Sequence, residues 1–164
     1  PGAEAIRGLL VSGDTARWSP ETEALLINAP RADHLDRTIR PALAKGQWVI
    51  CDRFADSTMA YQGYGMGLDR AWLEVLRKRV VGDTEPGLTL IFDLSVEVGL
   101  GRAIASQRYE KMGPAFHDKL RAAFKEMAVS KDGRKRVVID AGKDVDEVAR
   151  QVLHAVTSAY GLKA

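Results

Sequence analysis

The residues best suited to chemistry lie in one stretch, between Trp48 and Gly67. An apolar run, Gln47–Cys51, ends in the pair Asp52 and Arg53. A carboxylate at that position can hold a hydrated divalent cation, and a guanidinium is a rigid fork that suits phosphate oxygens. Polar residues follow the pair, namely Ser57, Thr58, Tyr61 and Gln62. The stretch suggests phosphoryl chemistry, although an isolated Asp-Arg pair is more often a surface ion pair beside a turn.

Three short apolar runs are the expected strands of a sheet that would position these residues. They are Gln47–Cys51, Leu88–Leu94 and Arg136–Asp140. Helical patterns follow them, at Leu68–Val81, Val96–Gln107, Ala115–Val129 and Val145–Tyr160. Strands that alternate with helices predict an α/β fold, with a parallel central sheet and helices on both faces. Because ligands of such sheets bind outside the carboxyl ends of the strands, we expect the site just after Cys51, Leu94 and Asp140.

The first part of the chain is expected to be helical. A helix-like stretch, Ala3–Val11, precedes a polar loop and a second stretch of helical spacing, Glu21–Leu43. Pro20 and Pro41 suit the ends of that second helix, whereas Pro30 lies inside it. An interior proline removes a backbone donor and clashes with the carbonyl one turn back, so we expect a kink or a break at Pro30.

Composition limits the classes of protein to be considered. The 164 residues are 46% hydrophobic and 28% charged, which is typical of an ordinary globular domain, so one domain over residues 1–164 is expected. The net charge of +2 is too small to argue for binding to nucleic acid or to a membrane. The single cysteine, Cys51, excludes an internal disulfide and fits a cytoplasmic location. The three histidines lie too far apart for metal-ligand spacing.

A family resemblance strengthens the interpretation of the Asp-Arg pair. The run Asp52-Arg53-Phe54-x-x-Ser57-Thr58-x-Ala60-Tyr61-Gln62-Gly63 resembles the signature of thymidylate kinases, the P-loop nucleoside monophosphate kinases that phosphorylate dTMP. Segments on both sides are similar to the same family, from Pro1-Gly2 and the stretch 19–43 to Leu90–Gly99 and Arg108–Met112. The resemblance implies a three-layer P-loop kinase fold with a lid region around residues 102–113.

The resemblance also implies roles for particular residues. Arg53 would bind the dTMP phosphate, and Asp52 would lie near Mg²⁺ and the transferring phosphoryl group. Arg31 would bond the thymine carbonyl edge, while Tyr61 would lie against the deoxyribose. The other substrate-binding candidates are Arg7, Ile27, Ser57, Thr58 and Gln62. On the side of the donor, ATP, the candidates are Arg102, Arg108 and Gly142. A homodimer is the implied assembly.

Two departures from the family pattern stand out. Ile27 occupies the position at which the family commonly stacks a phenylalanine on thymine, so the aromatic stack is lost. The chain also lacks the Gly-x-x-x-x-Gly-Lys-[Ser/Thr] phosphate loop, since its single Gly-Lys pair is followed by Asp144. We therefore expect absent residues before Pro1, including a strand and that loop. We also expect absences between Gly2 and Ala3 and between Ser106 and Arg108.

Two alternatives to a dTMP kinase are open at this stage. One is a kinase for another nucleoside or nucleotide, against which Arg31 with Thr58 and Gln62 favours a thymine edge. The other is a noncatalytic nucleotide-binding module that has lost its phosphate loop.

Overall fold

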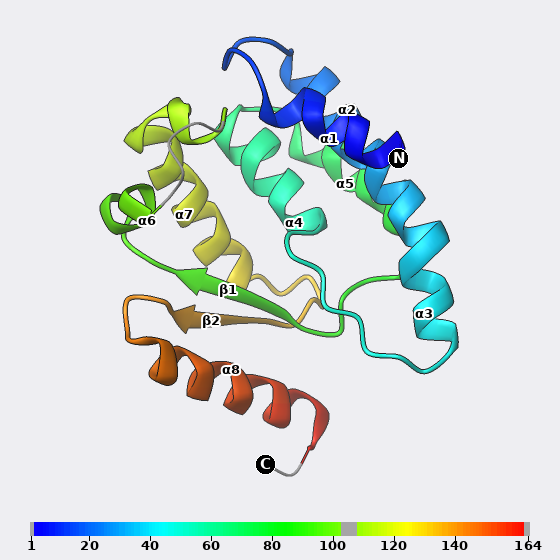
Figure 1. Cartoon of the computed structure of the whole chain (residues 1–164), viewed down its shortest axis with the longest axis vertical. Helices are drawn as coiled ribbons and strands as arrows, with labels where there is room; N and C mark the ends of the chain where they lie inside the picture. The colour runs from blue at the N-terminus through cyan, green and yellow to red at the C-terminus, as the bar shows by residue number, and fades with distance from the viewer. Residues whose placement is uncertain (1, 103–107, 163–164) are drawn as a thin grey trace.

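The computed structural model describes residues 2–102 and 108–162, which form a helix-rich molecule with a small sheet (Figure 1). The expectations for Pro1 and for residues 103–107, which are five of the twelve residues of the expected lid region, lie outside these residues. The α-helices are α1 (Gly2–Val11), α2 (Pro20–His34), α3 (Arg40–Ala44), α4 (Ala55–Thr58), α5 (Arg70–Val81), α6 (Val96–Arg102), α7 (Pro114–Ala128) and α8 (Val145–Tyr160). Two π-helical segments, η1 (Leu35–Ile39) and η2 (Met59–Gly65), and a 3₁₀ turn, η3 (Glu110–Met112), complete the helical elements.

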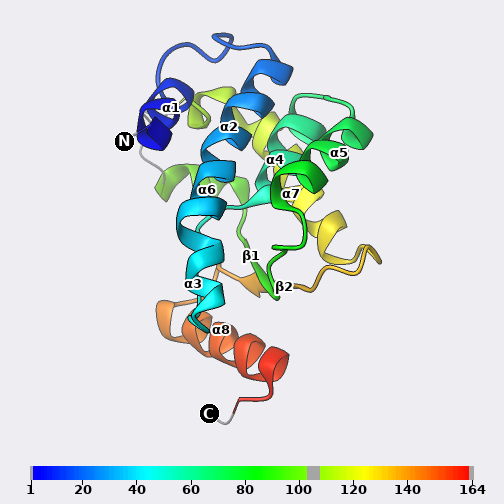
Figure 2. The same ribbon diagram turned by 90° about the vertical axis from the view of Figure 1, so that its right-hand side faces the viewer.

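The sheet consists of two parallel strands, β1 (Thr89–Asp93) and β2 (Arg136–Asp140). Their register pairs Thr89 with Arg136 and Asp93 with Asp140, so both carboxyl ends lie at one edge. Helix α8 lies on one side of the strands, and α7 with the other helices lies on the opposite side (Figures 1 and 2). This layering confirms the predicted α/β class with a parallel sheet between helices.

The third expected strand is a correction to the sequence interpretation. Residues 47–51 run as extended chain, and among the described residues no strand pairs with them. Trp48 is 65% exposed and Ile50 is 98% exposed. A β-strand is defined by its ladder of hydrogen bonds to a neighbour, so apolar composition alone does not produce one.

The long helical stretch before this segment differs from expectation in where it becomes irregular. Helix α2 is continuous through Pro30, so the expected break is wrong. The irregular turn is η1, where the backbone N–H of Arg40 donates to the carbonyl of Leu35, five residues back. Leu35 and Ile39 in this turn are buried against Ala55 and Val81. Tertiary packing therefore holds the helical path despite the missing proline donors.

Local sequence explains several helix ends. Ser19 caps α2 by accepting a hydrogen bond from the backbone of Thr22, and Asp144 caps α8 in the same way through Glu147. Gly161 follows α8 with φ +64, in the left-handed region that favours glycine. The expected helix Val96–Gln107 is described as far as Arg102, where α6 ends.

The larger core cluster lies between η2 and α7. It contains Ala60, Tyr61, Phe116, Leu120, Ala123 and Met127. Gly65 lies so close to this cluster that an added Cβ would come within 2.5 Å of the Phe116 ring. The cluster therefore fixes the segment that follows Arg53 against α7.

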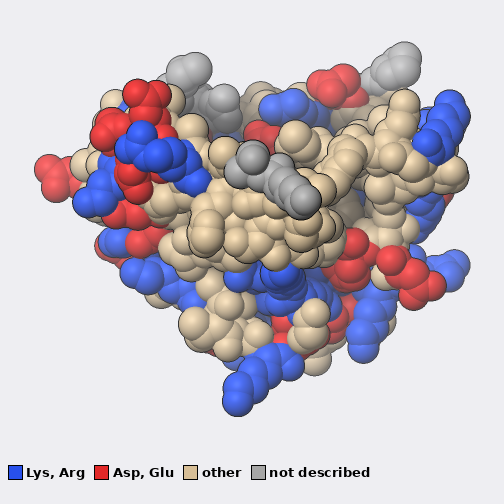
Figure 3. Space-filling view, turned by 90° about the horizontal axis from the view of Figure 1, so that it is seen from below, with Lys and Arg blue, Asp and Glu red and all other residues tan. Residues whose placement is uncertain are grey.

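The outer side of α8 is largely uncharged. Val145, Leu153 and Tyr160 are exposed on this helix, and the view from its side shows an uncharged area with charged residues around it (Figure 3). None of the helices in the described ranges has the length and apolar character needed to cross a membrane.

Candidate active site

A cavity of about 240 Å³ lies beyond the carboxyl end of β1. Its walls come from the segment after residue 52, from the end of β1, and from α6, η3 and α7. The polar side chains around it are those of Arg53, Tyr61, Asp93, Ser95, Glu110, His117, Arg121 and Lys125. This is the edge of the sheet at which parallel α/β folds bind ligands.

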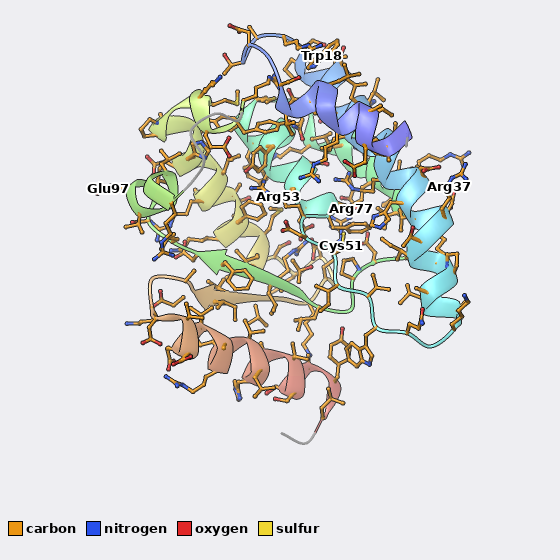
Figure 4. All side chains as sticks on the ribbon, viewed as in Figure 1. Trp18, Arg37, Cys51, Arg53, Arg77 and Glu97 are labelled. Atoms are coloured by element: carbon orange, nitrogen blue, oxygen red, sulfur yellow. The ribbon has the colours of Figure 1, made fainter. Side chains whose placement is uncertain are left out.

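Arg53 is held at this cavity by its backbone and by one neighbour. Its φ of +60 is the one positive value among the described residues other than glycine. Its Nη1 donates to the hydroxyl of Tyr61 at 2.6 Å, and its guanidinium carbon lies 5.0 Å from the centre of that ring. Figure 4 shows Arg53 inside the ring of helices, whereas Arg37 points outward. The Arg53 guanidinium therefore has a defined orientation.

The electrostatic surroundings keep Arg53 charged. Partial removal from water lowers the pKa of its guanidinium, but the Tyr61 hydroxyl and the Asp52 carboxylate outweigh this effect, and the net direction is upward. Asp52 itself is exposed. A fixed cation at the cavity and an exposed carboxylate are thus neighbours in the sequence.

A second group of predicted residues meets between α2 and α4. Arg31 donates through Nη1 to the hydroxyl of Thr58 at 2.9 Å and to Oδ1 of Asn28 at 2.6 Å. Its Nη2 donates to the carbonyl of Phe54 at 3.1 Å. Burial is the main cause that lowers the pKa of Arg31 to about 10, so the side chain stays cationic at neutral pH. The structure therefore brings together Arg31 and Thr58, two of the three residues expected at the thymine edge.

Gln62 and Arg108 are placed differently from their expected roles. Gln62 is 2% exposed, and its Nε2 donates to Oε1 of Glu23 at 2.7 Å. Arg108 is 1% exposed; it forms an ion pair with Glu23 and donates to the backbone carbonyls of Asp14 and Thr15. The Arg108 guanidinium is therefore bonded inside the protein, on the side of Glu23.

The other candidates lie farther from the cavity. Arg7 is exposed on α1, and Ile27 and Ser57 are half-buried. Arg102, at the end of α6, donates to the carbonyl of Ala141 at 3.4 Å, next to Gly142 in the turn after β2. Arg102 and Gly142 thus lie near each other beside the carboxyl end of β2.

Sequence reasoning missed a buried charge network below α4. Asp56 accepts hydrogen bonds from Arg77 Nη1 at 2.5 Å and from Arg136 Nε at 2.7 Å. Burial would raise the pKa of Asp56, but its bonds to Arg136 and Arg77 outweigh that effect and lower it. The network ties α4 to α5 and β2. Nothing in the spacing of these residues signals it, because they come from three distant segments.

Glu23 was also missed, although a signal was present. It lies four residues before Ile27 and eight before Arg31, which places it on the same face of α2. A carboxylate on an inward face needs a partner, and here Arg108 supplies it.

Comparisons with known proteins show the family of this chain. A family model described as thymidylate kinase matches residues 1–152. The thymidylate kinase of Caulobacter vibrioides is 50% identical over 165 residues, which cover 99% of this chain and 79% of the relative. That of Ruegeria pomeroyi is 48% identical, covering 95% of this chain and 75% of the relative. That of Dinoroseobacter shibae is 48% identical, covering 97% and 78%.

Proposed function

Because this chain belongs to the thymidylate kinase family, we propose that its phosphoryl transfer takes place at the cavity beyond β1. The chain phosphorylates dTMP to dTDP with ATP as the donor, a step of nucleotide biosynthesis. The matches give no support to a noncatalytic binding module. Such a transfer needs positioning and charge neutralisation, with no covalent intermediate on the enzyme.

Arg53 is proposed to clamp the phosphate of dTMP. The observation that carries this assignment is its placement, with φ +60 and a 2.6 Å bond to Tyr61 at the edge of the cavity. A fixed guanidinium costs no reorganisation when negative charge develops on the phosphate. Tyr61 is proposed to lie against the deoxyribose, next to the clamp.

Arg31 and Thr58 are proposed to read the thymine edge, with Ile27 and Ser57 beside them. The two are joined at 2.9 Å, so a base would meet a donor whose direction is already set. A carbonyl at the fourth position of the base accepts from arginine, whereas the amino group of cytosine would oppose one donor to another. Gln62 is proposed to hold η2 against α2, because its amide nitrogen donates to Glu23.

Mg²⁺ is proposed to bind at Asp52. Within the described ranges, no group of three or more His, Cys, Asp or Glu residues could hold a metal ion. Magnesium at kinase sites is usually held by one or two carboxylates together with the phosphates of the substrate, which one exposed aspartate fits. When bound, the ion supplies neutralisation of phosphate charge.

The donor side and the assembly are proposed more broadly. Arg102 and Gly142, near each other beside β2, are proposed to border the ATP site. We also propose a single domain with a lid around residues 102–113, a homodimer and a cytoplasmic location. Sedimentation velocity would test the dimer, because the mass obtained from it should be twice the mass of one chain.

Substitution of Arg53 tests the proposal. Arg53→Ala should lower dTMP phosphorylation by one to two orders of magnitude, because a charge-assisted contact contributes ~1.5–3 kcal/mol. Arg53→Lys should restore little activity, since a point charge does not replace a fork. Arg37→Ala is the control, because Arg37 is exposed and paired only along its own helical segment with Asp33. Activity of Arg53→Ala within twofold of the parent would refute the assignment.

A further inference from the structure

The carboxylate of Glu23 is the centre of a buried polar cluster that the proposed function does not use. Glu23 is 0% exposed and lies on α2. Its Oε1 accepts from Gln62 Nε2 at 2.7 Å and from the Tyr109 hydroxyl at 2.9 Å. Its Oε2 accepts from Arg108. Three donors from two distant segments thus converge on one carboxylate.

This convergence fixes the segment that contains Arg108 and Tyr109. A buried charge is costly unless it is paired and fully hydrogen-bonded, so each donor is strongly held. The other nitrogens of Arg108 donate to the carbonyls of Asp14 and Thr15, which ties the segment to the loop before α2. Burial, together with the charge of Glu23, raises the pKa of Tyr109, so its hydroxyl stays protonated and donates. The ring of Tyr109 therefore has one position.

From Tyr109 the contacts continue to the phosphate arginine. The rings of Tyr109 and Tyr61 pack edge to face, with centres 5.1 Å apart and an angle of 84°. Phe116 packs against Tyr61 at 6.0 Å, so Tyr61 is confined by two aromatic neighbours. The hydroxyl of Tyr61 then accepts from Arg53 at 2.6 Å. An unbroken series of contacts leads from Glu23 through Tyr109 and Tyr61 to Arg53.

We propose that Glu23 is a positioning residue for Arg53: it holds Tyr109, which fixes Tyr61, which in turn directs the Arg53 guanidinium into the cavity. The inference rests on the proposed role of Arg53 as the phosphate clamp. Glu23 itself touches no substrate in this scheme. Its loss should reduce recognition of the phosphate and leave recognition of the base unchanged.

A merely structural role makes a different prediction. If Glu23 only joins α2 to the segment that contains Arg108 and Tyr109, its loss should weaken the binding of every ligand in proportion to the loss of folded protein. Thymidine and dTMP differ only by the phosphate, so the ratio of their affinities separates the two roles.

The test is calorimetric binding of dTMP and of thymidine to the whole chain and its variants. Arg53→Ala is the reference and should lose at least about tenfold in affinity for dTMP, with thymidine within twofold. Glu23→Gln should lose about three- to tenfold for dTMP only. Tyr109→Phe keeps the ring and loses the hydroxyl, so its loss should be in the same direction and smaller. Tyr64→Phe is the matched control, because it loses a tyrosine–carboxylate bond to Glu126 in an exposed place.

Each outcome decides one point. The inference is overturned if Glu23→Gln and Tyr109→Phe lose affinity for dTMP and thymidine equally, or lose affinity for neither. In that case a loss of dTMP affinity alone in Arg53→Ala still supports the phosphate clamp. An unchanged ratio of the dTMP and thymidine affinities in Arg53→Ala refutes the proposed role of Arg53 as the phosphate clamp. The inference about Glu23 is then refuted as well. Thermal melting verifies folding, and if Glu23→Gln does not fold, Tyr109→Phe decides alone.

Discussion

Two regions of the molecule that meet at Arg53 are held in place by different means. On the side of α2, α4 and η2, buried charged residues fix the helices, with Glu23 at 0% exposure and Asp56 at 8%. On the side of residues 47–53, the chain is extended and open to water, with Ile50 at 98% exposure. Both sides meet at Arg53, which leaves the open segment and contacts Tyr61 on the helical side.

This difference shows what fixes the positions of the binding side chains. Arg31, Thr58 and Tyr61 are positioned by helices that buried ion pairs join to one another and, through Arg136, to β2. Arg53 obtains its direction from Tyr61, because the segment before it lacks partners among the described strands. Substitutions on the helical side should therefore have large effects on stability, and those on the open side small ones.

The largest expected effect is the loss of the charge on Asp56. Asp56→Asn removes the buried carboxylate that Arg77 and Arg136 share and leaves each arginine one outer partner, Glu85 and Asp132 respectively, which should cost ~3–5 kcal/mol of unfolding free energy. Urea unfolding measures this loss. Asp33→Asn breaks an exposed pair with Arg37 and should cost below ~1 kcal/mol. Equal losses in the two variants would remove the contrast between buried and open regions.

The next effect concerns specificity and not stability. Arg31→Ala should reduce the preference for dTMP over dCMP by ~1–3 kcal/mol, or roughly five- to 150-fold, because the donor that opposes the cytosine amino group is gone. The ratio of kcat/KM for the two nucleotides measures it. Thr58 should keep its place through α4, so the fold should survive. An unchanged ratio would show that the base lies elsewhere.

Sequence reasoning succeeded where a signal was local. The helix Val145–Tyr160 and the strand Arg136–Asp140 were predicted with their observed bounds, because apolar periodicity and caps lie within each segment.

Sequence reasoning failed where the outcome depended on distant partners. The expected strand Gln47–Cys51 has the right composition but lacks a neighbour in the described part of the chain. Arg108 was expected on the donor side, yet a buried carboxylate 85 residues away holds it. Long-range pairing of charges leaves no periodic mark in the sequence.

A smaller loss of stability is expected at low pH. Burial would raise the pKa of Asp132, but bonds to Arg136 and the backbone of Arg134 lower it to about 2. A lowered folded-state pKa gives stability that is complete above the unfolded value of about 4 and is lost as the pH falls towards 2. The urea midpoint should therefore decline below about pH 4, and less steeply in Asp132→Asn. Identical pH profiles would contradict the assigned ion pair.

The smallest effect is expected in the open segment. Ile50→Ala should change unfolding free energy by no more than ~0.5 kcal/mol, because the side chain is almost fully exposed. Ile139→Ala, at a position 1% exposed, should cost ~2–5 kcal/mol in the same urea experiment. A comparable loss at both positions would mean that residues 47–51 are packed in solution, and the comparison would be wrong.

The most direct measurement is a crystal structure of the chain with dTMP bound. It should place a phosphate oxygen within ~3 Å of the Arg53 guanidinium, with Tyr61 still bonded to Arg53 and the base against Ile27 and Arg31. A phosphate bound instead by Arg121 and Lys125 on α7, with Arg53 facing water, would contradict the claim that Arg53 is the clamp.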